Sequence, residues 1–262
     1  MRHTAIKRAE LHSARTWWVT QPEFRDYAAA FDPEGRYLYF LSLRTFDPMY
    51  DAVQFELSFP RAARPSLVAL QAGGPPPFEP AFRGLKPGAL AAADTAPAAL
   101  PAIEPEGLGR VAAFPVPEGR FSQIAGMARC KVVWIAQPVI GAHGRGGHKE
   151  SPGRLEVFDF DTAEVKTLLP QADHFAAAAD GHTLLVRTAR ELRAIDATRA
   201  ADDAGRPGGP PADGKPSRQS GLIDLARARP SVDPPAEWAQ MLAEVGRLQR
   251  DHFWMADMSG IN

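Results

Sequence analysis

Short apolar runs with a period of two dominate the chain between residues 37 and 195. Such runs of about four to six residues are typical of β-strands, whereas amphipathic helices repeat every 3.6 residues. The clearest runs are 37–42, 66–70, 111–114, 131–136, 155–160, 164–169, 183–188 and 191–195. The sequence therefore predicts a mainly β fold built from short strands.

Two segments repeat one turn and strand pattern. FDPEGRYLYFLS at 31–42 and AAADGHTLLVRT at 177–188 both place an Asp and a Gly in a turn before a strand. Gly accepts a positive φ there and Asp bonds local amides. A third unit, GMARCKVVWIAQ at 126–137, keeps the apolar strand without the Asp-Gly pair. Repeated units of this kind favour propeller blades, although a β-sandwich would also give short strands.

The strand count predicts a partial β-propeller. About eleven strands make about three four-stranded blades, whereas closed propellers have about four to eight blades. We expect the propeller at 1–199, interrupted by a Pro/Ala-rich insertion at 71–107. A flexible linker is expected at 200–220, and the last strand and first helix of a truncated helical domain at 221–262. Blade edges left without neighbours would need further polypeptide or another subunit to cover them.

A helix is predicted after residue 231. Asp233 stands at the N-cap position and Pro234 at the first helical position. Apolar side chains and one His then follow at three- and four-residue spacing: Trp238, Met241, Leu242, Val245, Leu248 and His252. Such a stripe has to pack against something, and only MADMSGIN follows the helix in this sequence. We therefore expect the first helix of a longer helical region.

Charge and cysteine content exclude several classes of function. The 30 Lys and Arg residues balance 31 Asp and Glu residues, so no strong positive field favours nucleic acid or an anionic membrane as a partner. Cys130 is the single cysteine, which excludes an internal disulfide and a cysteine-based metal site. The sequence has no apolar stretch long enough for a signal peptide or a membrane span, which predicts a soluble cytoplasmic protein.

Motifs for catalysis or metal binding are weak. The sequence has no G-x-S-x-G elbow. His143 and His148 lie in the Gly-rich loop GAHGRGGHKE without further ligands nearby, and the D-x-D of Asp159 and Asp161 lacks the rest of a calcium loop. Asp251 and His252 are neighbours on a helix and do not face each other. We predict no catalytic, cofactor-binding or metal-binding residue in this chain.

The segment 42–70 allows two interpretations. It carries the arginines Arg44, Arg61 and Arg64 together with Phe46, Tyr50, Phe55 and Phe59. The arginines are candidate peptide contacts, since a guanidinium binds a carboxylate through two parallel hydrogen bonds. Alternatively, the aromatic residues form a small satellite core and the arginines are its ion-paired rim.

Three long motifs resemble the tricorn protease family. They are YLYFLSLRTFDPMYDAVQFELSFPRAARPSLVAL at 37–70, RVAAFPVPEGRFSQIAG at 110–126 and AEWAQMLAEVGRLQRDHFWMADMSGIN at 236–262, and they occur in the family's order. The resemblance covers 26–262 with breaks at the two Pro/Gly-rich stretches, and the first twenty or so residues show no such match.

The resemblance implies a large cytoplasmic serine peptidase that degrades oligopeptides. Such proteins carry two propellers, a helical region, a PDZ domain and a mixed α/β catalytic domain. This sequence looks like the last blades of the second propeller and the first helix of the helical region. The Ser-His-Ala-Tyr type motif of the family's catalytic His and its nucleophilic Ser motif are both missing here, so no catalytic residue can be carried over.

We therefore expect a fragment of a tricorn-like peptidase that is inactive alone. Its partners would be oligopeptides, met through the intact assembly, and either the missing parts of the same protein or other subunits. The alternative is a non-catalytic propeller module that binds peptides or proteins without cleaving them.

Overall fold

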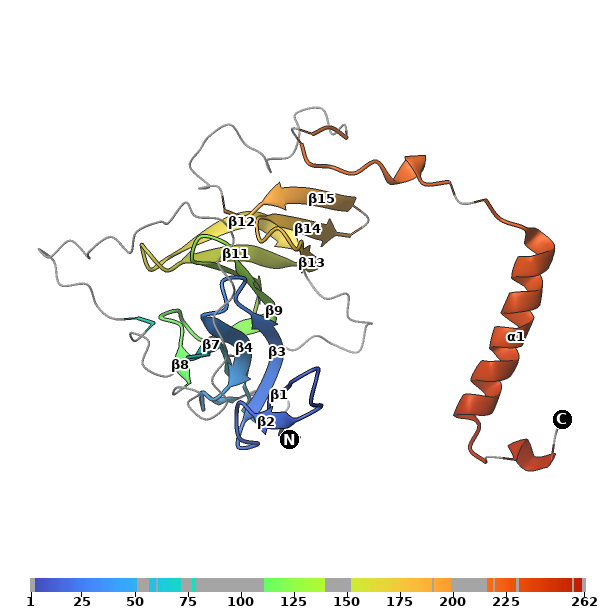
Figure 1. Cartoon of the computed structure of the whole chain (residues 1–262), viewed down its shortest axis with the longest axis horizontal. Coiled ribbons are helices and arrows are strands. Elements are labelled where there is room, and N and C mark those ends of the chain that lie inside the picture. The colour runs from blue at the N-terminus through green and yellow to red at the C-terminus, as the bar shows by residue number, and fades with distance from the viewer. Residues whose placement is uncertain are drawn as a thin grey trace, which may run out of the picture. The chain divides into compact units, whose positions relative to one another are not determined.

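The computed structural model describes residues 3–50, 57–59, 61–71, 77–78, 111–139, 152–189, 191–198, 216–218, 220–229, 231–255 and 257–260. The chain divides into two compact units, Met1–Ile223 and Asp224–Asn262 (Figure 1). Most of the predicted insertion at 71–107, most of the linker at 200–220, and His143 and His148 lie outside the described residues.

Three antiparallel sheets make up the first unit. Sheet A has the order β3-β4-β7-β8, sheet B the order β12-β11-β10-β9, and sheet C the order β13-β14-β15. The bounds in sheet A are β3 (Arg25–Phe31), β4 (Tyr37–Leu43), β7 (Ala63–Ala69) and β8 (Ala112–Ala113). Those in sheet B are β9 (Arg120–Met127), β10 (Lys131–Gln137), β11 (Gly153–Asp159) and β12 (Glu164–Ala172). Those in sheet C are β13 (His174–Ala177), β14 (Thr183–Thr188) and β15 (Glu191–Asp196).

Two small hairpins accompany these sheets. One pairs β1 (Lys7–Ala9) with β2 (Thr16–Trp18), and the other pairs β5 (Met49–Tyr50) with β6 (Leu57–Ser58). An isolated bridge between Leu222 and Arg193 joins the segment around Leu222 to β15 of sheet C. The mainly β prediction is confirmed, and the three sheets follow one another as consecutive propeller blades do (Figure 1).

The repeated Asp-Gly turns adopt the same geometry. Gly35 and Gly181 have φ values of 72° and 70°. The amide of Asp32 donates to the carbonyl of Tyr37, as the amide of Ala178 donates to that of Thr183, both at 2.9 Å. The third unit lacks this glycine, and Arg129 and Cys130 take the positive φ values instead, in the three-residue loop between Met127 and Lys131.

The three turns also bind one another across the sheets. The amide of Arg129 in sheet B donates to the carboxylate of Glu34 in sheet A at 3.1 Å. The amide of Ala128 donates to the carbonyl of Gly181 in sheet C at 2.8 Å. These bonds align the three sheets at the end where their first hairpins turn.

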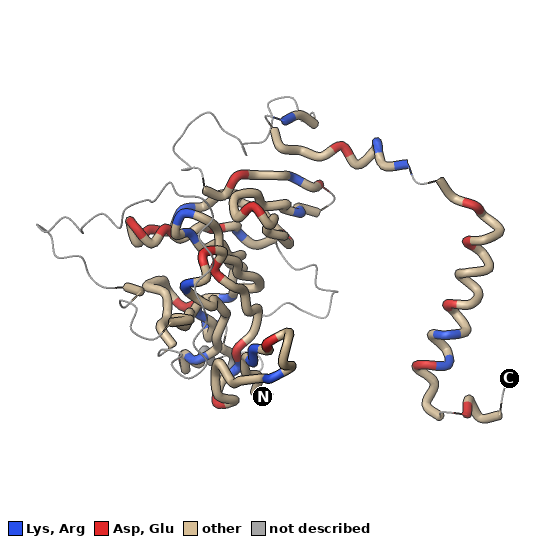
Figure 2. Tube along the Cα trace, viewed as in Figure 1, with Lys and Arg blue, Asp and Glu red and all other residues tan. Residues whose placement is uncertain are grey.

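The hydrophobic core lies between the faces of neighbouring sheets and on the outer face of sheet A. Between sheets A and B the core is mostly aromatic and contains Tyr39, Phe114, Trp134 and Phe158. Between sheets B and C the core is mostly aliphatic: Met127, Val133, Ile135, Leu155, Val157, Leu169, Ala172, Phe175, Leu184, Val186, Ile195 and Ala197. Ile6, which precedes β1, covers the other face of sheet A by packing with Leu38, Phe40, Val68 and Leu70. Acidic and basic residues are interspersed along the strands, with no separation by sign (Figure 2).

Sequence reasoning missed several strands and misjudged one. It did not identify β1, β2, β3, β9 or β13, and the predicted strand at 111–114 is reduced to the two residues of β8. The β9 sequence RFSQIAGM mixes polar and small residues, so its apolar pattern is weak.

The second unit contains the predicted helix, α1 (Pro234–His252), between η1 (Leu225–Arg227) and η2 (Met258–Gly260). Asp233 occupies the N-cap position, although its side chain makes no capping bond. None of the residues in α1 is buried, and Trp238 and Leu242 are 66% and 76% exposed. Among the described residues, no helix is long and apolar enough to cross a membrane.

We expect Gly126→Ala to destabilise the chain by about 1–3 kcal/mol, because overpacking between fixed elements forces them apart. A Cβ atom at Gly126 would lie 2.8 Å from the Tyr39 ring, 2.9 Å from the Pro33 ring and 3.0 Å from the Phe31 carbonyl. Urea unfolding followed by circular dichroism measures the effect. Gly119→Ala is the control, since its Cβ would meet only the Phe121 ring, at 3.4 Å. Equal stability of the two variants would contradict this packing.

A second pair of variants tests whether α1 contributes to the stability of the sheets. Leu155→Ala should cost about 2–5 kcal/mol, because this side chain is fully buried between sheets B and C. Leu242→Ala should change the free energy of unfolding by less than about 0.5 kcal/mol, since its side chain is exposed. A loss at Leu242 comparable to that at Leu155 would show that the helix stripe is buried in solution.

Candidate functional site

The first strands of sheets A, B and C are held together by side-chain bonds to the backbone. The hydroxyl of Tyr27 in β3 donates to the carbonyl of Phe121 in β9 at 2.9 Å. The amide of Phe175 in β13 donates to the side-chain oxygen of Gln123 at 2.9 Å, and Nε2 of Gln123 donates back to the Phe175 carbonyl at 3.3 Å. In a propeller these first strands border the central channel.

These contacts place two arginines and one histidine at the same end of the neighbouring strands. Arg25 is the first residue of β3, Arg120 the first of β9 and His174 the first of β13, and all three are exposed. Burial raises the pKa of Tyr27, and the positive charges of Arg25 and Arg120 oppose that rise. We call Arg25, Arg120 and His174 the inner rim.

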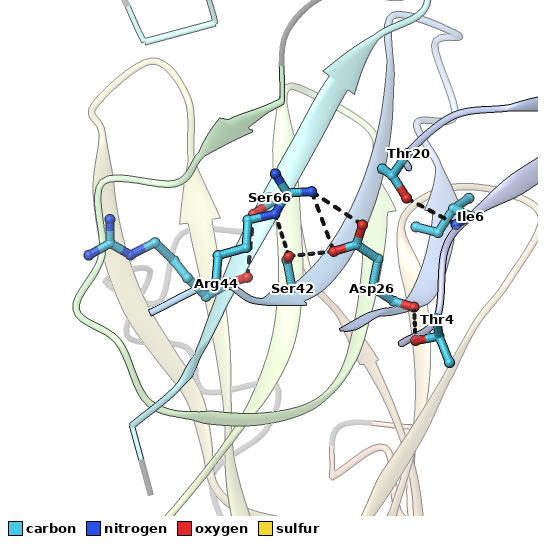
Figure 3. Close-up of polar contacts among 8 residues, drawn as sticks. Thr4, Ile6, Thr20, Asp26, Ser42, Arg44 and Ser66 are labelled. Atoms are coloured by element: carbon cyan, nitrogen blue, oxygen red, sulfur yellow. Dashed lines mark hydrogen bonds and ion pairs between the residues drawn. The ribbon is translucent and has the colours of Figure 1, made fainter. Parts of the chain in front are cut away.

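Arg44, predicted as a candidate peptide contact, is already bound to two side chains of sheet A, Asp26 and Ser42. Its Nη2 lies 3.2 Å from Oδ2 of Asp26, and its Nε donates to the Ser42 hydroxyl at 2.6 Å (Figure 3). The Ser42 hydroxyl in turn donates to Oδ1 of Asp26. The Asp26 side chain is fully buried, so removing Arg44 would leave a buried carboxylate without its cation. This cluster stabilises the end of the sheet.

The cluster does not activate Ser42 as a nucleophile. A serine nucleophile needs a base that accepts its proton, oriented by a third group. Here the hydroxyl lies between a carboxylate and a guanidinium that also bind each other (Figure 3). The arrangement is that of a buried ion pair with a bridging hydroxyl.

Arg61 and Arg64 differ in their surroundings. Arg64 forms an ion pair with Glu118, which precedes β9. Arg61 is exposed and makes no ion pair among the described residues. Ser42 pairs with Arg64 between β4 and β7, so the three arginines share one end of sheet A, but two of them are occupied.

The aromatic residues of this segment are only partly described. Phe46 is 81% exposed and its ring lies 5.5 Å from the half-buried ring of Phe59. The Tyr50 side chain and Phe55 lie outside the described residues. The ion pairs of Arg44 and Arg64 match the ion-paired rim for those two arginines, whereas the exposed Phe46 does not form part of a core.

Acidic pairs that resembled functional motifs in the sequence have structural roles. Oδ1 of Asp159 accepts the amides of Asp161 and Thr162, and its other oxygen pairs with Lys131 at 3.0 Å. Asp251 pairs with Arg247 one turn away on α1, at 2.7 Å. In the described part of the chain, no group of His, Cys, Asp and Glu side chains is arranged to hold a metal ion.

The inner rim was missed because nothing local marks it. Arg25, Arg120 and His174 share only their position as first residues of the first strand in each sheet. Two of those strands open with an Arg one or two places before an aromatic residue, RDY and RFS. That is the one shared signal in the sequence, and it is too short to find the site unaided.

Comparison with known proteins gives consistent matches. A family model described as the tricorn protease second beta propeller domain matches residues 1–198, and one described as the tricorn protease C1 domain matches residues 234–262. The first match begins at residue 1, so the expectation that the first twenty residues lie outside the resemblance was wrong.

Relatives and solved structures agree with these matches. Tricorn protease homolog 1 of Streptomyces coelicolor is 36% identical over 93% of this chain and 23% of its own length. A putative tricorn-like protease C-terminal subunit of Sulfurisphaera tokodaii is 32% identical over 97% of this chain and 27% of its own length. A crystal structure of the tricorn protease matches 98% of this chain and 23% of its own chain, with a TM-score of 0.72 at 22% identity.

The structural match shows that the fold is that of a tricorn propeller. The chain spans between 23% and 27% of the length of these two relatives. Because one family model covers 198 of the 262 residues, the chain belongs to the tricorn protease family.

Proposed function

We propose that this chain is the propeller portion of a tricorn-type serine peptidase, and that it receives oligopeptides and carries no catalytic residue itself. The observation that carries the proposal is the match of 1–198 to the second propeller and of 234–262 to the C1 domain. Hydrolysis of oligopeptides in the cytoplasm would then belong to the assembled peptidase, with this chain acting beside the rest of the protein or other subunits.

The proposed layout has three parts. Residues 1–199 form the partial propeller with its insertion at 71–107, residues 200–220 form a linker, and residues 221–262 begin the helical region. The exposed stripe of α1, with Trp238 66% and Met241 59% exposed, supports a helix that continues into further helical structure. An apolar stripe of that size is not stable in water without a packing partner.

The inner rim is the proposed peptide-contact surface, in place of Arg44 and Arg64. Those two arginines are neutralised by Asp26 and Glu118, whereas Arg25 and Arg120 make no ion pair among the described residues. Exposed cations at a channel mouth attract acidic side chains and carboxyl termini and raise the rate of encounter. Arg61 stays a candidate for a further contact because it is exposed at the same end of sheet A.

The first test is turnover. We expect the purified chain to release no product from fluorogenic oligopeptides, because a propeller portion supplies neither a nucleophile nor a base. A relative that includes the catalytic region serves as the positive control under the same conditions. Hydrolysis by this chain that survives repeated purification would overturn the proposal.

The second test is binding at the inner rim. We expect Arg25→Gln to weaken the binding of an acidic hexapeptide, measured by isothermal titration calorimetry, by about threefold to tenfold at low salt and less at high salt. Arg129→Gln is the matched control, because this exposed arginine lies just beyond the opposite end of β9. Equal losses from both variants would mean that the peptide senses overall charge and does not recognise the rim.

A further inference from the structure

A groove of about 590 Å³ lies along sheet B, beside the connection that leads from sheet A into β9. Val116 and Glu118 of that connection form one wall. Trp134, Glu156 and Val165, from three successive strands of sheet B, form the other wall, and Arg120 of the inner rim also lines the groove. The groove therefore extends across the sheet from its first strand to its last. Its volume is in the range of sites that bind small molecules or a few peptide residues.

A β-bulge shapes the groove. Trp134 pairs with Ile124, but Ala136 pairs with Phe121, one residue nearer the start of β9 than a regular ladder would place it. Since side chains alternate between the faces of a strand, this shift turns Phe121 to the face that carries Trp134. The two rings meet edge to face with centroids 6.1 Å apart. A regular ladder would put the small polar Ser122 in that place.

The carboxylates of the groove are already satisfied. Oε2 of Glu156 accepts the indole N–H of Trp134 at 2.9 Å, and its Oε1 accepts Nε of Arg154 at 3.1 Å. Glu118 is paired with Arg64. Arg154 is the ion-pair partner of Glu156, so among the described residues Arg120 is the charged group of the groove without an ion pair. The open charge in the groove is therefore positive.

We propose that this groove binds a carboxylate carried on an apolar chain. Arg120 binds the carboxylate, and the apolar chain lies between Val116 on one wall and Phe121 and Val165 on the other. A cationic ligand does not fit, because both glutamates are neutralised by arginines. If the proposed function holds, the ligand is the carboxyl-terminal end of an oligopeptide with apolar residues, and the groove is a second contact beyond the inner rim.

The test uses three probes in isothermal titration calorimetry: acetyl-Ala-Ala-Leu with a free carboxyl terminus, its carboxyl-terminal amide, and N-acetyl-leucine. We expect the free acid to bind about tenfold or more tightly than the amide, because a charge-assisted hydrogen bond is lost in the amide. Arg120→Gln should remove that difference. N-acetyl-leucine should bind more weakly than the peptide acid and compete with it.

Val165→Trp tests the groove away from the inner rim. Val165 lies on the outermost strand of sheet B and is 40% exposed, so a larger side chain narrows the groove without entering the core. We expect Val165→Trp to weaken the binding of the peptide acid by about tenfold, because an apolar contact with the ligand is lost. Leu185→Trp in sheet C, where the native side chain is 37% exposed, is the control and should change affinity less than about twofold.

The outcomes separate this inference from the proposed function. Three results would overturn the proposal that the groove binds a carboxylate: equal binding of the peptide acid and its amide, no effect of Val165→Trp on binding, or no binding of either the peptide acid or N-acetyl-leucine. If the hexapeptide still binds in a way that depends on Arg25, the proposed function stands without the groove. Binding of N-acetyl-leucine that Val165→Trp removes, in a chain that binds no hexapeptide, supports the groove and contradicts the proposed function.

Discussion

The packing of sheet B on both of its faces is the constraint on which the rest of the structure depends. Its strand KVVWIAQ sends Val132 and Trp134 toward sheet A, and Val133 and Ile135 toward sheet C. A strand buried on two faces is stable only between two neighbours. The close approach at Gly126, the turns that bond across the sheets and the meeting of β3, β9 and β13 are all consequences of that double packing.

Strands and turns with local signals could be predicted from the sequence. The runs that became β4, β10 and β14 are strongly apolar, and the turns at Gly35 and Gly181 are encoded in a few adjacent residues. The helix was found from Pro234 and the stripe that follows it. By contrast, β9 owes its place to the neighbours it pairs with and to a bulge, and neither leaves a clear pattern in RFSQIAGM.

The candidate site was beyond sequence reasoning for the same reason. Arg44 is neutralised by Asp26, 18 residues earlier, and Arg64 by Glu118, 54 residues later. These pairs form only once the strands are in register, so three arginines that look equivalent in sequence differ in their availability. By contrast, Arg25, Arg120 and His174 are far apart in the sequence and come to lie at the same end of neighbouring strands only once the three sheets have formed. The family resemblance predicts the class of function, whereas the register of the strands decides which arginines stay unpaired among the described residues.

The burial of Trp134 makes the protein its own optical reporter. Of the five tryptophans, Trp134 is fully buried, whereas Trp18, Trp238 and Trp254 are 47%, 66% and 80% exposed. Its indole is bonded to Glu156 and surrounded by aromatic rings, so its emission should be shifted to the blue relative to the others and resist aqueous quenchers. The fluorescence of Trp134 would report separation of sheets A and B even while the rest of the chain stays folded.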